Sequence, residues 1–408
     1  MMSQQTWYSS PLVFAFICLS IVLFYFLGVR SLPKIQTYTK SNTLSQPSAK
    51  GKNYDEKDPY LDIESENNIE LQHEEPLQLR PFRPKFHLTM ALENTTFSEF
   101  LLMDKTYQSR IRLRRHLVET REHDTIACNP KANSAVLELY SWLTTTYLPL
   151  RFPTAFTLST HPSNASTQPH LHNTLTSDSL PLHPASPLHA LRLLGSHIDT
   201  DILLLLPSST TTKYHLEAFA TCFPSGFNTR AKLGLGLADI HTPVPGYAQK
   251  LERSMDRFFA GLPRGKMVKR ANWSVTTNRE LFCLEGNHGK VEGVGGAGGV
   301  GGEGLPGGRE GEREGEGKGE EGGEEEQFEI EDCVLRCERQ TLHRLPETGA
   351  LVFAFKTYQY ELGDVKREGN GEALAQAIEG LRAGSVPSIN VYKRGAVWGK
   401  KVKEYLRT

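Results

Sequence analysis

The segment Val291–Glu326 limits what this chain can fold into more than any other stretch, because it consists almost entirely of Gly and Glu. A segment of this composition cannot bury enough apolar surface to offset the entropy of ordering it. It lies between a strand-like run that ends near Thr277 and another that begins at Cys333. We therefore predict a disordered insert, assigned to residues 286–328, in a connection between two strands of an antiparallel sheet.

The formal net charge of the 408 residues is −1, but the Gly/Glu-rich segment is strongly acidic, so the rest of the chain is basic. The six cysteines are too scattered for a disulfide framework in a chain of this length and are expected to be reduced thiols. We expect no nucleic acid among the partners.

An uncharged apolar run at residues 11–29 is long enough to cross a bilayer as a helix. Residues 1–10 contain no Lys or Arg, and bulky side chains end the run, which favours an uncleaved anchor over a signal peptide. Positive charges begin after the run, so we predict a luminal or extracellular N-terminus and a cytoplasmic folded domain. The polar residues 30–80 are predicted to be a disordered tether, and the protein a single-pass protein of the endoplasmic reticulum.

Hydrophobic periodicity predicts an α+β domain over residues 81–408. Helices are expected at 104–117, 134–147, 247–259 and 372–381, and strands at 198–206, 214–223, 267–277, 333–342 and 351–360. The His-rich stretch 154–187 is expected to be a loop without a metal site, because no Cys or carboxylate spacing supports its histidines. The basic residues near the C-terminus are expected to be solvated.

The predicted strand at 267–277 carries polar side chains on one face. Alternation places Arg270 and Asn272 on that face and Trp273 on the other, where we expect it to be core. Arg and Asn side chains on one face of a strand must lie in water or in a polar pocket.

The predicted strand at 333–342 has the same character. Period two places Arg336, Glu338 and Gln340 on one face. Two interpretations stay open from spacing alone: a pocket lined by these side chains, or an exposed face with a surface ion pair between Arg336 and Glu338.

His241 is the best single ligand candidate, because it follows a short helical pattern and lies in a turn fixed by Pro243 and Pro245. A structural hydrogen bond is the alternative for such a histidine. The arginines between 110 and 115 form a basic flank on the first predicted helix. Most are expected to be solvated, and a minority to contact an anionic cofactor group.

Eight features along the chain together resemble the haem-dependent oxidative N-demethylase catalytic (alpha) subunit and its relatives in the HRQ family. They are Pro81-Phe-Arg-Pro, His87-Leu-Thr-Met, Tyr107 with the helix that carries Arg110 to Arg115, Cys222-Phe-Pro-Ser-Gly, Ile240-His-Thr-Pro-Val-Pro-Gly, Ser254-Met-Asp-Arg-Phe-Phe, Arg270-Ala-Asn-Trp-Ser and Glu338-Arg-Gln-Thr-Leu. The resemblance extends from Pro81 to about Lys393.

This resemblance implies a PAS-like antiparallel sheet with flanking helices that binds haem b. It implies a monooxygenase-like oxidoreductase, which uses O2 and electrons from an external flavin and iron–sulfur partner to convert a small secondary amine to a primary amine and formaldehyde. By motif position, His241 is the expected ligand of the iron, with His87 and His343 as the next choices. Arg114 and Arg339 are assigned to bind the cofactor.

The resemblance also implies catalytic roles for three residues on the two polar strands. Glu338 is expected to hold the protonated amine and to accept its proton. Arg270 and Asn272 are expected to polarise O2 or to bind a haem propionate. Two alternatives stay open for the protein as a whole: a haem-binding PAS-like sensor, or a catalytically silent, membrane-tethered binding protein.

Overall fold

The structure is a computed structural model that describes residues 58–67, 69–159, 169–211, 213–291 and 327–408. These residues belong to one folded unit, Glu56–Thr408. No helix within these ranges is long and apolar enough to cross a membrane. The predicted anchor at 11–29 and the terminus at 1–10 lie outside the described residues, as do residues 30–57 of the tether and most of the Gly/Glu-rich segment.

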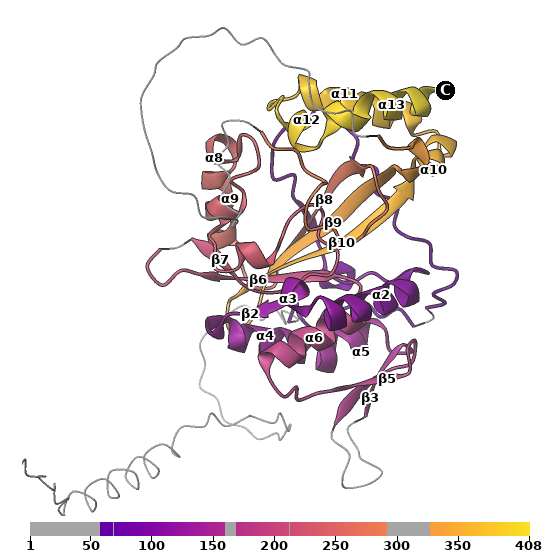
Figure 1. Ribbon diagram of the computed structural model, residues 1–408. Helices are drawn as coiled ribbons and strands as arrows, with labels where there is room; N and C mark the ends of the chain where they lie inside the picture. The colour runs from indigo at the N-terminus through magenta and orange to yellow at the C-terminus, as the bar shows by residue number, and fades with distance from the viewer. Residues whose placement is uncertain (1–57, 68, 160–168, 212, 292–326) are drawn as a thin grey trace, which may run out of the picture. The chain divides into compact units, whose positions relative to one another are not determined.

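Seven antiparallel strands form the central sheet, in the order β1-β8-β9-β10-β6-β7-β2 (Figure 1). The strands are β1 (Glu93–Thr95), β2 (Ile126–Cys128), β6 (Asp201–Pro207), β7 (Tyr214–Ala220), β8 (Met267–Thr276), β9 (Val334–Arg344) and β10 (Leu351–Glu361). All five predicted strands are present. The α+β class is confirmed, and β8 and β9 are direct neighbours although the segment 292–326 separates them in the sequence.

The helices are α2 (Tyr107–Thr120), α3 (Glu122–Thr125), α4 (Asn133–Trp142), α5 (Leu148–Arg151), α6 (Pro187–His197), α7 (Leu237–Ile240), α8 (Tyr247–Lys250), α9 (Glu252–Gly261), α10 (Leu362–Arg367), α11 (Gly371–Ala383), α12 (Ile389–Tyr392) and α13 (Gly395–Arg407). A π-helical turn, Leu143–Tyr147, joins α4 to α5, and short 3-10 turns lie at Phe97–Glu99, Pro130–Ala132, Arg230–Lys232 and Ile330–Asp332.

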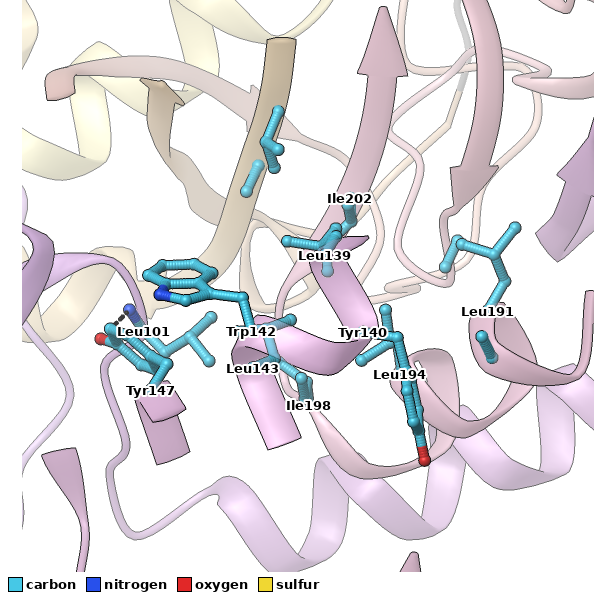
Figure 2. Close-up of a cluster of buried hydrophobic side chains, with 14 of the residues drawn as sticks. Leu101, Leu139, Tyr140, Trp142, Leu143, Tyr147, Leu191, Leu194, Ile198 and Ile202 are labelled. Atoms are coloured by element: carbon cyan, nitrogen blue, oxygen red, sulfur yellow. Dashed lines mark hydrogen bonds between the residues drawn. The ribbon is translucent and has the colours of Figure 1, made fainter. Parts of the chain in front are cut away.

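Alternation along β9 divides the sheet into two faces, which we name the Glu338 face and the His343 face. Two groups of helices cover the His343 face. One group, α2, α4 and α6, packs on β6, β7 and β10. Figure 2 shows part of its core, where Leu139 of α4 lies near Ile202 of β6 and Trp142 lies near Tyr147. The other group, α10, α11 and α13, packs on β8, β9 and the far end of β10.

The Glu338 face is covered by apolar side chains at only one end. There α7, α8 and α9 pack on the sheet, with Tyr247 and Phe259 in one core with Val268 of β8 and Leu342 of β9. Farther along β8 and β9, the same face carries half-buried polar side chains. This polar part of the face positions the candidate site.

Two predicted loops are in fact regular structure. The stretch 154–187 contains a second sheet of β3 (Phe156–Ser159), β4 (His170–Asn173) and β5 (Asp178–Pro181), whose Leu171 and Leu180 are buried. The basic C-terminus is helix α13, because Trp398, Val402 and Leu406 recur at helical spacing and are buried. In both segments the apolar residues stand singly among many polar ones, so the hydrophobic pattern did not indicate a strand or a helix.

Two helix boundaries also differ from prediction. The second helix continues past Pro149, which lies in the first turn of α5, where its missing N–H group is tolerated. The first helix begins at Tyr107 and not at Asp104, whose carboxylate forms a buried ion pair of 2.7 Å with Lys356.

The folded unit begins at Glu56, before the predicted start at residue 81. The first residues of the predicted insert 286–328 also belong to it. Tyr60, in the predicted tether, is buried against Phe97 and Trp142. Asn287, in the predicted insert, is also buried, and the Gly289 N–H donates to the Tyr392 carbonyl at 2.9 Å. The tether around Tyr60 and the first residues of the insert therefore pack against the domain.

Candidate functional site

Strand register brings three of the predicted site residues together on the Glu338 face. Asn272 of β8 lies opposite Glu338 of β9, and Arg270 lies opposite Gln340. Residues that face each other across neighbouring strands have their side chains on the same side of the sheet. The amide nitrogen of Gln340 donates to a carboxylate oxygen of Glu338 at 2.9 Å, so Gln340 orients the carboxylate.

Four basic residues surround this carboxylate closely enough for their charges to act on it or on one another. We call the whole group the Glu338 cluster; it comprises Lys232, His241, Arg270, Asn272, His288, Arg336, Glu338, Gln340, Tyr392 and Lys393. Within the described part of the chain, Glu338 forms no direct ion pair with any of the four cations. With these four cations and the one carboxylate of Glu338, the cluster holds more positive than negative charge.

Arg336 uses its guanidinium group to support the loops beside the cluster. One terminal nitrogen donates to the Glu280 carbonyl at 2.9 Å, and the other to the carbonyls of Phe223 at 2.8 Å and Leu281 at 3.1 Å. The side chain is buried, so the surface ion pair with Glu338 that one interpretation offered is not formed. Glu338 and Gln340 on the same face are half-buried.

Lys393 closes the outer edge of β8. Its ammonium group donates to the Asn272 side-chain oxygen at 3.2 Å and to the Trp273 carbonyl. Desolvation lowers the pKa of this buried lysine to about 8. Trp273 itself is buried on the other face, as predicted.

The side chains of Arg270 and Lys232 have hydrogen-bond donors that no described residue accepts. The Nε atom of Arg270 is buried without a partner, and neither side chain donates a hydrogen bond to any described residue. Lys232 lies over the Phe227 ring, 4.6 Å from its centroid, and desolvation lowers its pKa to about 8. Two cations without acceptors beside a sheet face are suited to bind an anionic group.

His241 follows α7 and lies close enough to Lys232 and Arg270 for their charges to act on its ring. Its Nδ1 donates to the Leu237 carbonyl at 2.8 Å, and the ring stacks on Tyr247 at 4.6 Å. Desolvation lowers its pKa to about 4, so the ring is neutral at pH 7 and Nε2 carries a lone pair. A histidine held in this tautomer by a backbone carbonyl is suited to ligate a metal.

His288 is a member of the cluster that sequence reasoning missed. Its Nδ1 donates to the Gly226 carbonyl at 3.3 Å, its ring stacks on Tyr392, and its pKa is lowered to about 4 by desolvation. Gly226 has φ +74°, and a Cβ there would lie 2.8 Å from the His288 ring. The glycine that ends the Cys222-Phe-Pro-Ser-Gly motif was the available signal, because only Gly permits this approach.

Four residues named from the sequence lie away from the cluster. Arg339 is on the His343 face and pairs with Glu99 at 3.2 Å. Arg114 is fully buried in α2 and pairs with Asp201 at 2.7 Å. His343 is packed among aromatic rings on its own face, and His87 is exposed.

The described ranges contain no group of three His, Cys, Asp or Glu side chains arranged to hold a metal ion. The cluster instead offers single imidazoles, uncompensated cations and one carboxylate. This set suits a large anionic group whose metal needs only one or two protein ligands.

None of the curated proteins compared with the chain matches it. A family model described as "Haem-dependent oxidative N-demethylase, alpha subunit-like" matches residues 91–403, a range that includes every residue of the Glu338 cluster. The match covers well over half of the chain. The chain therefore belongs to the haem-dependent oxidative N-demethylase alpha subunit-like family.

Proposed function

We propose that this protein binds haem b through His241 and oxidises a secondary amine to a primary amine and formaldehyde, using O2 and electrons from a partner protein. The observation that carries the proposal is the neutral His241 ring, with Nδ1 fixed by the Leu237 carbonyl and Nε2 left without a partner among the described residues. Haem enzymes commonly use such an imidazole as the iron ligand.

The residues of the cluster fit a haem in a second respect. Haem b carries two carboxylates, and Lys232 is a half-buried cation without an acceptor among the described residues, near His241. Its ammonium group would hold one of them. When bound, the haem supplies activation of O2 and a path for electrons, chemistry that no protein side chain provides.

Glu338 acts on the substrate in this proposal. A secondary amine is protonated at neutral pH, so it needs an anion to bind it and a base to take its proton before oxidation. The carboxylate of Glu338 does both, and Gln340 fixes its orientation through the 2.9 Å hydrogen bond.

The finer parts of the proposal rest on the sequence. The chain carries no evident flavin or iron–sulfur motif, so we propose that electrons come from a separate flavin and iron–sulfur protein. We also propose that the sheet and its helices act as a PAS-like ligand pocket. Anchoring at the endoplasmic reticulum through residues 11–29 is proposed from their hydropathy alone.

The test is an absorption spectrum of the purified full chain after haem reconstitution, before and after dithionite and carbon monoxide. We expect a Soret band that shifts with carbon monoxide in the parent protein, loss of the band in His241→Ala, and retention in His87→Ala, whose ring is exposed. A His241→Ala protein with an unchanged spectrum would overturn the ligand assignment. A featureless parent spectrum would overturn the function.

A second variant tests the catalytic carboxylate. Glu338→Gln keeps the shape of the side chain and removes its charge, so the haem spectrum should remain while formaldehyde release falls at least a hundredfold, in the range for loss of a general base. Retained formaldehyde release would refute the role of Glu338. Haem binding without formaldehyde release in the parent protein would favour the sensor alternative.

A further inference from the structure

The charges of the Glu338 cluster constrain which amine can bind there. Arg336 and Lys393 spend most of their donors on protein acceptors, but their charges remain, and Arg270 and Lys232 add two more cations against the single carboxylate of Glu338. Even with a haem dianion balancing part of this charge, a simple alkylammonium ion would enter a site of its own sign. Like charges in a partly desolvated site repel strongly.

Arg270 and Glu338 also stand in a specific arrangement. Arg270 is opposite Gln340, two residues beyond Glu338 on β9, so Arg270 and Glu338 are diagonal neighbours on one face. The structure forms no ion pair between them, and Arg270 finds no acceptor elsewhere in the described chain. A guanidinium and a carboxylate that lie side by side and unpaired match a ligand with adjacent negative and positive groups.

We propose that the substrate is an N-methylated amino acid, whose secondary ammonium group binds Glu338 and whose carboxylate binds the guanidinium of Arg270. This inference rests on the proposed function and names its substrate class. The ligand is a zwitterion, so it adds no net charge to the cluster. Asn272, between Lys393 and Glu338 on the same face, lines the same place.

The reaction balances for such a substrate. One O2, two electrons from the reductase partner and two protons are consumed for each N-methyl group. One oxygen atom ends in formaldehyde and the other in water, the bond between nitrogen and the methyl carbon breaks, and the free amino acid is the other product.

Both the substrate and haem carry carboxylates, so the experiment must separate the two sources. The haem-loaded full chain is titrated with N-methylglycine, with its methyl ester and with dimethylamine, and each Kd is measured from the change in the Soret band. The ester and dimethylamine keep the secondary amine but lack the carboxylate. We expect N-methylglycine to bind at least ten times more tightly than either.

Arg270→Gln should weaken N-methylglycine binding at least tenfold and leave the Kd for dimethylamine and for haem within about twofold, by the usual size of a charged hydrogen bond. Arg253→Gln, at an exposed arginine of α9, is the matched control and should change none of these values. Weakened haem binding with unchanged N-methylglycine binding would overturn the proposal, since Arg270 would then hold a propionate.

If Arg270→Gln does not fold, the three ligands still test the proposal on the parent protein. Dimethylamine that binds as tightly as N-methylglycine, or more tightly, would overturn the substrate proposal and leave the proposed function standing. If no haem binds, the proposed function fails separately. Binding of N-methylglycine to the haem-free chain is then measured by calorimetry instead of by the Soret band. Binding lost in Arg270→Lys, which keeps the charge without the planar fork, would support the proposal. No detectable binding to the haem-free parent chain would overturn it.

Discussion

Lys393 donates a hydrogen bond of 3.2 Å to the side chain of Asn272, although 121 residues separate the two in the sequence. The same ammonium group donates to the Trp273 carbonyl. β1 pairs only with Met267–Lys269, so the rest of this edge of β8 has no strand beside it. Lys393 therefore satisfies an edge carbonyl that would otherwise be buried without a donor, and it connects the C-terminal helices to the candidate site.

Lys393→Met should destabilise the protein, because the buried Trp273 carbonyl and the half-buried Asn272 side-chain oxygen lose their donor. We expect a loss of about 1–3 kcal/mol in the free energy of unfolding, measured by urea denaturation. Lys400→Met is the matched control, because Lys400 is exposed and donates no hydrogen bond to a described residue, and it should change the stability by less than about 0.5 kcal/mol. Equal effects of the two variants would mean that Lys393 has no structural role.

Gly226→Ala should also destabilise the fold, by about 1–3 kcal/mol, because Ala disfavours φ +74° and its Cβ would collide with the His288 ring. Gly261→Ala is the control. Its new Cβ would meet no atom within 4 Å, and α9 would gain a better helix former, so its stability should be equal or slightly higher. Thermal unfolding of both variants at one pH checks the difference, and a stable Gly226→Ala protein would contradict the link between this glycine and His288.

The sheet of the site could be predicted because alternation is a local signal. Arg270, Asn272 and Glu338 each stand at positions whose face follows from period two, and β8 and β9 are consecutive strands of an antiparallel meander. The register that sets Asn272 opposite Glu338 depends on the pairing of the whole strands, so no local pattern specifies it. His241 stood out by its place after a short helical pattern and beside Pro243 and Pro245, and the resemblance to a family added its assignment to the iron.

The remaining site residues had no local signal. Lys232 and Lys393 are single lysines in polar contexts, and such residues are usually solvated. Their burial depends on the packing of α12 and of the loop before α7, which are distant in sequence from β9. His288 stands beside the Gly/Glu-rich segment and shows no periodicity. Arg339 was assigned to the cofactor by resemblance, whereas alternation along β9 places it on the other face.

His343→Leu should stabilise the protein at pH 7, by about 1–2 kcal/mol. The imidazole is fully buried against Phe97, Phe100 and Trp142, and neither ring nitrogen has a partner of normal hydrogen-bond geometry among the described residues. Replacing an unsatisfied polar ring by an apolar side chain of similar volume removes its desolvation cost. The haem spectrum should be unchanged, because His343 lies on the opposite face from Glu338.

His343→Leu should also change how the free energy of unfolding depends on pH. Burial lowers the pKa of His343 from 6.5 to about 4, so below pH 6.5 the unfolded chain binds a proton that the folded chain does not. Stability is therefore full above pH 6.5 and falls as the pH drops toward 4, by roughly 3 kcal/mol for this one group. Urea unfolding between pH 7 and pH 4 should show a shallower loss in His343→Leu than in the parent protein, and parallel curves would contradict the assignment.

Arg114→Met should destabilise the protein by about 3–5 kcal/mol, because it leaves the Asp201 carboxylate buried without its partner. That carboxylate also accepts hydrogen bonds of 2.8 Å from the backbone N–H groups of Cys222 and Phe223, so the pair fixes the start of the loop that carries Gly226.

Arg112→Met, at an exposed position two residues earlier in α2, is the control and should cost less than about 0.5 kcal/mol. Folded Arg114→Met protein, recovered at low temperature, should bind one haem with the parent's affinity, since Arg114 acts through the loop and not on the cofactor. A well-folded Arg114→Met protein that has lost haem would instead support the prediction from sequence that Arg114 binds the cofactor.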